Sequence, residues 1–101
     1  MPLLNLPEKY FRILNQLLLE YVPEAEVWAY GSRVSGTAHE TSDLDLVLRN
    51  PSDLLSPQNK LIELRVALSE SHLPILVDVM DWARIPQVFR DEIERAHVVL
   101  H

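Results

Sequence analysis

The 101-residue chain lacks cysteine and any long apolar run. Without cysteine there are no disulfide bonds and no thiolate metal sites, so a bound metal ion must take oxygen or imidazole ligands. No apolar segment is long enough to span a bilayer, and no basic region precedes an apolar core at the N-terminus. We therefore expect a cytoplasmic protein with no membrane partner, built as a single domain over residues 1–101.

Positive charge is also scarce, because nine Lys and Arg residues stand against fifteen Asp and Glu residues, a formal net charge of −6. The basic residues are scattered and form no stripe along the sequence. Cationic surface supplies most of the affinity of a protein for nucleic acid. We therefore expect no direct nucleic-acid binding, and part of the acidic excess is explained if carboxylates hold divalent cations.

Hydrophobic periodicity predicts an alternation of helices and strands. The predicted helices cover residues 7–21, 57–71 and the segment after Pro86, with one helical turn at 32–36. The predicted strands cover residues 26–30, 43–48 and 75–80, the last of them buried on both faces. Ser56 is the predicted cap of the second helix, and residues 98–100 form a short apolar tail. This order predicts an α+β sandwich, a small mixed sheet backed by helices.

Three aspartates stand out because aspartate is disfavoured inside strands. Asp43 and Asp45 share one face of their strand, with Cα atoms about 7 Å apart. Asp78 lies in the most apolar strand, and the nearby Asp81 is the alternative candidate for the third carboxylate. Close carboxylates repel each other unless a cation lies between them, and three oxygen donors suit Mg²⁺ or Mn²⁺. We predict a metal site at Asp43, Asp45 and Asp78; the alternative is that they are a turn residue, a solvent-facing residue and the partner of an arginine.

A Gly31-Ser32 turn follows the first predicted strand, ten residues before Asp43. Backbone N–H groups at the start of a helical turn bind anions, and glycine allows a close approach. The Ser32 hydroxyl can reach a phosphate oxygen. Arg33 either neutralises phosphate charge or is a solvated surface residue. Gly31, Ser32 and Arg33 are thus the candidate residues for binding a nucleotide triphosphate.

Gly31-Ser32, ten residues and then Asp43-Leu44-Asp45 resembles the GS-x10-DxD signature of the DNA polymerase β-like nucleotidyltransferase superfamily. The short length, the stretch GSRVSGTA and the ending RAHVVL resemble the minimal nucleotidyltransferase (MNT) domain. This resemblance extends over almost the whole chain.

The resemblance implies a nucleotidyltransferase fold, two Mg²⁺ or Mn²⁺ ions, and ATP as substrate. Asp43 and Asp45 would bind metal, and Asp78 would bind metal and help to deprotonate the attacking hydroxyl. Gly31 and Ser32 would hold the triphosphate. Proteins of this type are typically antitoxins that pair with a HEPN-domain toxin, an RNase, and transfer AMP from ATP to a tyrosine of that toxin.

Two other functions stay open at this point. One is a non-catalytic antitoxin that masks its partner through the first helix, whose wide apolar stripe follows Leu3, Leu4 and Leu6. The other is the catalytic subunit of a small-molecule nucleotidyltransferase, although so short a chain leaves little room for an acceptor pocket. The acceptor, the preferred nucleotide, the number of nucleotides transferred and the homo- or hetero-oligomeric state are not determined by the sequence.

Overall fold

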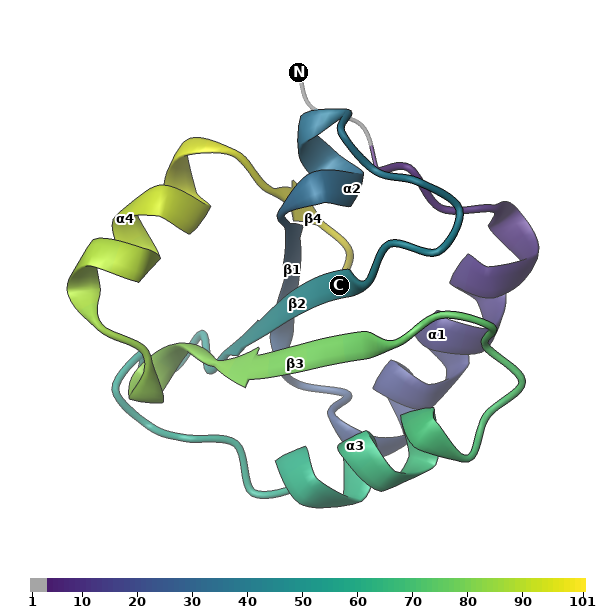
Figure 1. Cartoon of the computed structure of the whole chain (residues 1–101). Coiled ribbons are helices and arrows are strands. Elements are labelled where there is room, and N and C mark those ends of the chain that lie inside the picture. The colour runs from purple at the N-terminus through teal and green to yellow at the C-terminus, as the bar shows by residue number, and fades with distance from the viewer. Residues whose placement is uncertain (1–3) are drawn as a thin grey trace.

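The computed structural model describes residues 4–101, so Leu3 lies outside the described residues, and over this range it has a four-stranded mixed sheet between helices (Figure 1). The helices are α1 (Glu8–Tyr21), α2 (Ser32–Ser35), α3 (Leu61–Ser69) and α4 (Gln87–Arg95), with a 3-10 turn, η1 (Trp82–Arg84). The strands are β1 (Glu26–Tyr30), β2 (Leu44–Arg49), β3 (Val77–Asp81) and β4 (Val98–Val99). Within residues 4–101, no helix has both the length and the apolar character needed to cross a membrane. The expected α+β class is confirmed.

The strands are arranged in the order β3-β2-β1-β4. β1 runs antiparallel to both β2 and β4, whereas β2 and β3 are parallel. Parallel neighbours need a crossover connection, and here α3 lies within the segment that joins them (Figure 1). The mixed sheet of the prediction is therefore correct, and its parallel pair is β2 with β3.

The two faces of the sheet carry different side chains because successive residues of a strand point in opposite directions. Leu44, Leu46 and Leu48 of β2 are buried in a main core with residues of α1 and α3, as the alternation predicted. Val47 points the other way, into a smaller cluster under α4 that contains Trp28, Trp82, Ile85 and Ile93. Residues of β2 in step with Val47, including Asp45, therefore belong to the face on which α4 lies.

The apolar stripe of α1 is used mainly by the protein itself. Leu14 and Leu18 are fully buried, and Leu17 and Tyr21 pack against the same core. Leu4 and Leu6, which precede the helix, also pack there, and Leu19 is exposed. The breadth of the stripe is thus explained by folding and does not favour a partner interface on this helix.

The start of one helix, its cap residue and the burial of one strand differ from the prediction. The helix expected from Pro57 begins only at Leu61, because the Gln58 N–H donates to the Asp81 carboxylate at 2.9 Å and holds the preceding segment as a loop. Lys60, and not Ser56, occupies the cap position. β3 is an edge strand, so the expectation that it is buried on both faces is wrong: Val79 is buried and Asp78 is exposed.

The apolar tail is a fourth strand. Val98 and Val99 pair with β1, and hydrogen bonds between Val27 and the two residues that follow β4 extend the contact. A two-residue strand is too short to show an alternation of apolar and polar side chains, so the sequence does not predict which strand it pairs with. Its role is to cover the edge of β1 that β2 leaves free.

The main core predicts how two positions on α3 respond to truncation. Leu64→Ala removes a side chain that is completely buried, and we expect it to lower the free energy of unfolding by about 2–5 kcal/mol. Ile62→Ala on the same helix is the matched control, because Ile62 is 70% exposed and its loss leaves no cavity. Urea unfolding of both variants measures the difference, and equal losses would contradict this description of the core.

Candidate active site

A row of three polar side chains crosses the sheet from β1 to β3. Tyr30 is the register partner of Asp45, and Asp45 is the register partner of Asp78. Neighbouring strands lie about 4.8 Å apart, so the Asp45 and Asp78 backbones are at this separation. The structure therefore brings together two of the three predicted carboxylates, on the face of the sheet away from α1 and α3.

Asp43 lies immediately before β2 at the same end of the sheet. The Leu44 N–H donates to the Leu76 carbonyl at 2.9 Å, so the pairing with the β3 segment extends up to the residue next to Asp43. Burial raises the pKa of Asp45, and the carboxylates of Asp78 and Asp43 raise this pKa further. The three acids are thus close enough for the charge of Asp45 to respond to both of the others.

Tyr30 closes the row on the β1 side. Its ring meets that of Phe89 in α4 edge-to-face, with centroids 5.5 Å apart. Burial raises the pKa of the Tyr30 phenol, and the negative charges of Asp45 and Asp78 raise it further. The phenol therefore stays neutral, and with Phe89 it forms an aromatic wall beside the carboxylates.

The Gly31 turn places the backbone against the Asp45 carboxylate. Gly31 has φ +81°, and a Cβ atom at this position would overlap Asp45 Oδ2 and lie 3.3 Å from Asp45 Cγ. α2 follows at once, as expected for a single helical turn, with Val34 and Ser35 N–H groups donating to the Gly31 carbonyl. Only glycine satisfies both the backbone conformation and the close approach. The turn of Gly31 and Ser32 therefore lies beside Asp45, one of the three carboxylates (Asp43, Asp45 and Asp78) that we call the acid row.

Arg33 does not have the position expected for a phosphate ligand. It is 4% exposed, and its guanidinium donates to four backbone carbonyls, those of Asn5, His39, Glu40 and Ser42. Four of its five N–H groups are therefore occupied inside the protein. This burial contradicts the expected solvated surface position. The four carbonyl acceptors give no support to phosphate binding, which stays a prediction.

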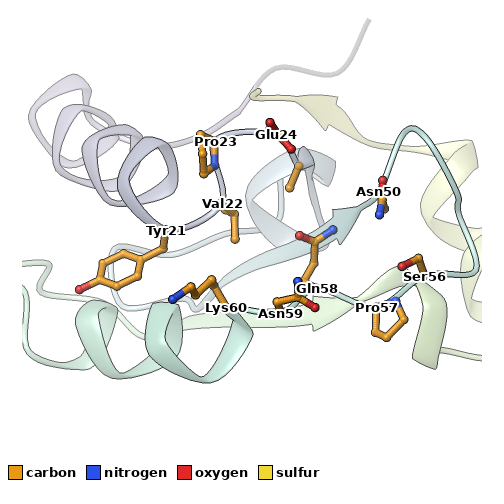
Figure 2. A pocket seen from close by; sticks show the side chains of 11 residues that line it. Tyr21, Val22, Pro23, Glu24, Asn50, Ser56, Pro57, Gln58, Asn59 and Lys60 are labelled. Atoms are coloured by element: carbon orange, nitrogen blue, oxygen red, sulfur yellow. The ribbon is translucent and has the colours of Figure 1, made fainter.

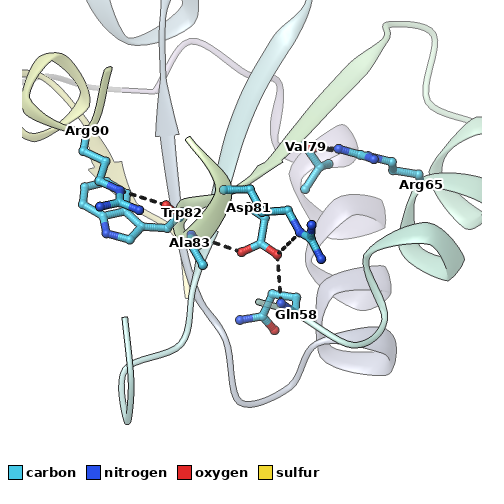
Figure 3. A network of polar contacts seen from close by, with 8 residues as sticks. Gln58, Arg65, Val79, Asp81, Trp82, Ala83 and Arg90 are labelled. Carbon is cyan, nitrogen blue, oxygen red and sulfur yellow. Dashed lines mark hydrogen bonds and ion pairs between the residues drawn. The ribbon is translucent and has the colours of Figure 1, made fainter. Parts of the chain in front are cut away.

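Asp81, the alternative candidate for the third carboxylate, has a structural role (Figure 3). It is 3% exposed, its carboxylate accepts from the N–H groups of Gln58 and Ala83, and Arg84 lies 3.7 Å away. Asp81 also pairs in register with Leu48, whose side chain is in the main core. It lies three residues after Asp78 and so faces the other side of the sheet, away from Asp45.

The donor set has the chemistry that Mg²⁺ or Mn²⁺ requires, since it consists of hard carboxylate oxygens. Within the described range, no three His, Asp or Glu side chains are gathered closely enough to form a ready-made metal site. Asp43 and Asp78 are exposed and Asp45 is half-buried, and like charges keep such groups apart when no cation lies between them. The acids fit a divalent ion in chemistry, and their role as its ligands stays a prediction.

A separate hollow lies at the opposite end of β1 (Figure 2). It is lined by the end of α1, the segment before β1 and the loop that leads into α3. Pro23 and Glu24 precede β1, whereas Gly31 follows it, so the length of the strand separates this hollow from the acid row. None of the predicted site residues lines it.

Comparison with known proteins agrees with this fold. Residues 14–101 match the family model described as "Polymerase beta, Nucleotidyltransferase", so the chain belongs to this nucleotidyltransferase family. The family expected from the Gly-Ser and Asp-x-Asp motif is thereby confirmed, and with it the enzyme class.

Two particular proteins are similar over most of the chain. A protein of Haemophilus influenzae (strain ATCC 51907 / DSM 11121 / KW20 / Rd), described as "Probable protein adenylyltransferase MntA", is 39% identical over 99 residues, which are 96% of this chain and 83% of that protein. A chain of the solved structure "Crystal structure of the toxin-antitoxin with AMP-PNP" has the same fold, with a TM-score of 0.72 and 22% identity over 90% of this chain and 72% of that one.

The two glycines form a matched pair for testing the turn. Gly31→Ala and Gly36→Ala both place a Cβ at positive φ, but only at Gly31 does that Cβ meet the Asp45 carboxylate; at Gly36 it meets nothing within 4 Å. We expect Gly36→Ala to cost about 1–2 kcal/mol, because Gly36 is in the left-handed helical region. Gly31→Ala should cost more, because its ψ of −156° lies in a region that only glycine readily adopts. Only Gly31→Ala should abolish the thermal shift that we expect with ATP and Mg²⁺. Differential scanning fluorimetry measures this shift, and equal shifts in the two variants would contradict the assigned geometry.

Burial of Asp45, together with repulsion from Asp78 and Asp43, raises its pKa and so predicts a pH-dependent stability. A carboxyl group whose pKa is higher in the folded than in the unfolded chain destabilises the fold when ionised, and this penalty disappears as the pH falls through the folded pKa. We therefore expect Asp45→Asn to raise the free energy of unfolding at pH 7 in EDTA, with a gain that shrinks on acidification. Asp53→Asn, an exposed aspartate away from the row, is the control. Urea unfolding at several pH values would contradict the prediction if Asp45→Asn were the less stable protein at pH 7.

Proposed function

We propose that this protein transfers AMP from ATP to a tyrosine hydroxyl of a partner protein, a HEPN-domain RNase toxin, and acts as the antitoxin of that pair. The observation that carries the proposal is the acid row: Asp45 and Asp78 are register partners, and Asp43 stands at the same end of the sheet. Two further facts support it. The relative from Haemophilus influenzae is described as a protein adenylyltransferase, and the structure with the same fold is a toxin-antitoxin with AMP-PNP.

Gly31 and Ser32 are the proposed triphosphate-binding residues. Gly31 has no side chain to block the approach of a phosphate, and the Ser32 hydroxyl follows it on the turn beside Asp45. Asp43, Asp45 and Asp78 would hold two divalent ions, which when bound neutralise the triphosphate and polarise the α-phosphate. The aromatic wall of Tyr30 and Phe89 limits the site on the side of α4.

The proposed reaction is an in-line displacement at the α-phosphorus. The tyrosine oxygen forms a bond to this phosphorus, the bond to the oxygen bridging to the β-phosphate breaks, and pyrophosphate leaves. The phenolic proton passes to the Asp78 carboxylate, which is the better placed acceptor because Asp78 is exposed whereas Asp45 is half-buried. Charge neutralisation and positioning provide most of the rate enhancement in such transfers.

A macromolecular acceptor suits the openness of the site. Asp43 and Asp78 are exposed, and Asp78 lies on β3, an edge strand of the sheet. An acceptor bound there gains its contacts from outside this chain. This favours a partner protein over a small molecule, which would need a concave pocket of its own. The use of α1 for the core also favours catalysis over masking through that helix.

Single carboxylate variants test the proposed function. Asp43→Asn, Asp45→Asn and Asp78→Asn should each lower the rate of transfer by at least about 100-fold, because each removes a charge from the transition-state environment, while the fold is retained. Glu92→Gln, at an exposed carboxylate of α4, is the control and should keep wild-type activity. The measurement is the intact mass of the partner toxin after incubation with ATP and Mg²⁺, where each transfer adds one AMP. Wild-type activity in any of the three aspartate variants would overturn the assignment.

A further inference from the structure

We propose that Arg33 is a positioning residue for the metal-binding carboxylates: its buried guanidinium fixes the loop that delivers Asp43 to the acid row. The inference rests on the proposed function, because it takes Asp43 as a metal ligand. It assigns Arg33 a role through the backbone of that loop, with no contact to substrate.

The guanidinium joins two segments that are far apart in the sequence. Nη1 donates to the Asn5 carbonyl at 2.8 Å, and Nε donates to the Ser42 carbonyl at 3.0 Å. Nη2 donates to both His39 and Glu40 carbonyls, at 3.3 and 3.0 Å. Three of the four acceptors therefore belong to the short stretch that ends one residue before Asp43.

This stretch is itself a closed turn. The His39 N–H donates to Ser42 Oγ at 2.7 Å, and the Ser42 N–H donates back to the His39 carbonyl at 3.1 Å. On the far side of Asp43, the Leu44 N–H is held by the Leu76 carbonyl of the segment before β3. Asp43 thus stands between two anchored residues, and its exposed side chain is placed by the backbone alone.

The anchor is in turn held by the N-terminal segment. The Asn5 N–H donates to the Arg33 carbonyl at 2.7 Å while the Asn5 carbonyl accepts from the Arg33 side chain, so the two residues are bonded in both directions. Arginine suits this position because its rigid fork of five N–H groups reaches several carbonyls at once, which the single ammonium of lysine does not. The charge is buried among carbonyl dipoles and is not available to a phosphate.

The first test is direct binding of Mn²⁺ in the absence of ATP, followed by electron paramagnetic resonance of the free ion. Arg33→Gln and Arg33→Lys should weaken Mn²⁺ binding by about 10- to 100-fold, the usual effect of removing a group that orients metal ligands. Arg12→Gln is the control, because the Arg12 side chain is 76% exposed and pairs with the exposed Glu8. Ser42→Ala removes the Oγ that accepts from the His39 N–H but keeps the Ser42 carbonyl that accepts from Arg33. It should weaken Mn²⁺ binding in the same direction, which keeps the test valid if an Arg33 variant does not fold.

The second test separates positioning from phosphate binding and from a purely structural role. In the transfer reaction, Arg33→Lys should lower kcat and raise the Mg²⁺ concentration needed for half-maximal rate, while the KM for ATP stays unchanged. A raised KM for ATP with unchanged Mn²⁺ affinity would overturn the proposal, as would folded Arg33 variants and Ser42→Ala that all bind Mn²⁺ like the wild type. If instead the wild type binds Mn²⁺ but modifies no toxin, the proposed function fails while the Mn²⁺ comparison still decides the role of Arg33.

Discussion

The parallel register between β2 and β3 is the constraint on which the site depends. It makes Asp45 and Asp78 direct neighbours and at the same time places Leu46 opposite Val79 in the main core. A shift of one residue would turn every side chain of one strand to the other face, so it would bury Asp78 and expose Val79. Core packing on one face therefore fixes the position of the acids on the other, and the unfavourable closeness of two carboxylates is maintained by apolar burial that does not involve them.

The part of the site that could be predicted from the sequence is the part that depends on the alternation of side chains along one strand. The leucines of β2 and the aspartates between them have period two, which determines their faces whatever lies beside the strand. The Gly31 turn was equally readable, because a glycine after a strand and before a helical turn has few structural meanings. Asp78 was placed correctly beside Asp45 only because β3 proved to be the parallel neighbour of β2.

The features that could not be predicted depend on long-range contacts. Arg33 has four carbonyl acceptors, one of them 28 residues away in the sequence, and the residue type alone does not predict them. β4 is defined by its pairing with β1 and not by any pattern of its own two residues. The late start of α3 follows from the bond between Gln58 and the Asp81 carboxylate, which competes with helix formation. In each case tertiary structure decides between local options of similar stability.

The open acid row fits an enzyme whose second substrate is another protein. The chain supplies the carboxylates, the glycine turn and an aromatic wall, all at one end of a small sheet. Little of the chain remains to form a pocket for an acceptor, since α1 and α3 are committed to the main core on the opposite face. In the proposed function, this chain provides the chemistry of nucleotide transfer, and the partner would provide the acceptor together with the surface that holds it.

Asp43, Asp45 and Asp78 are proposed to act together on one nucleotide-bound metal site. The most direct measurement is a crystal structure with Mn²⁺ and a non-hydrolysable ATP analogue, with the ions located by anomalous scattering. We expect anomalous peaks within bonding distance of all three carboxylates, with the triphosphate against Gly31 and Ser32. Peaks that leave Asp78 without a metal contact, or a nucleotide bound in the hollow at the other end of β1, would contradict this proposal.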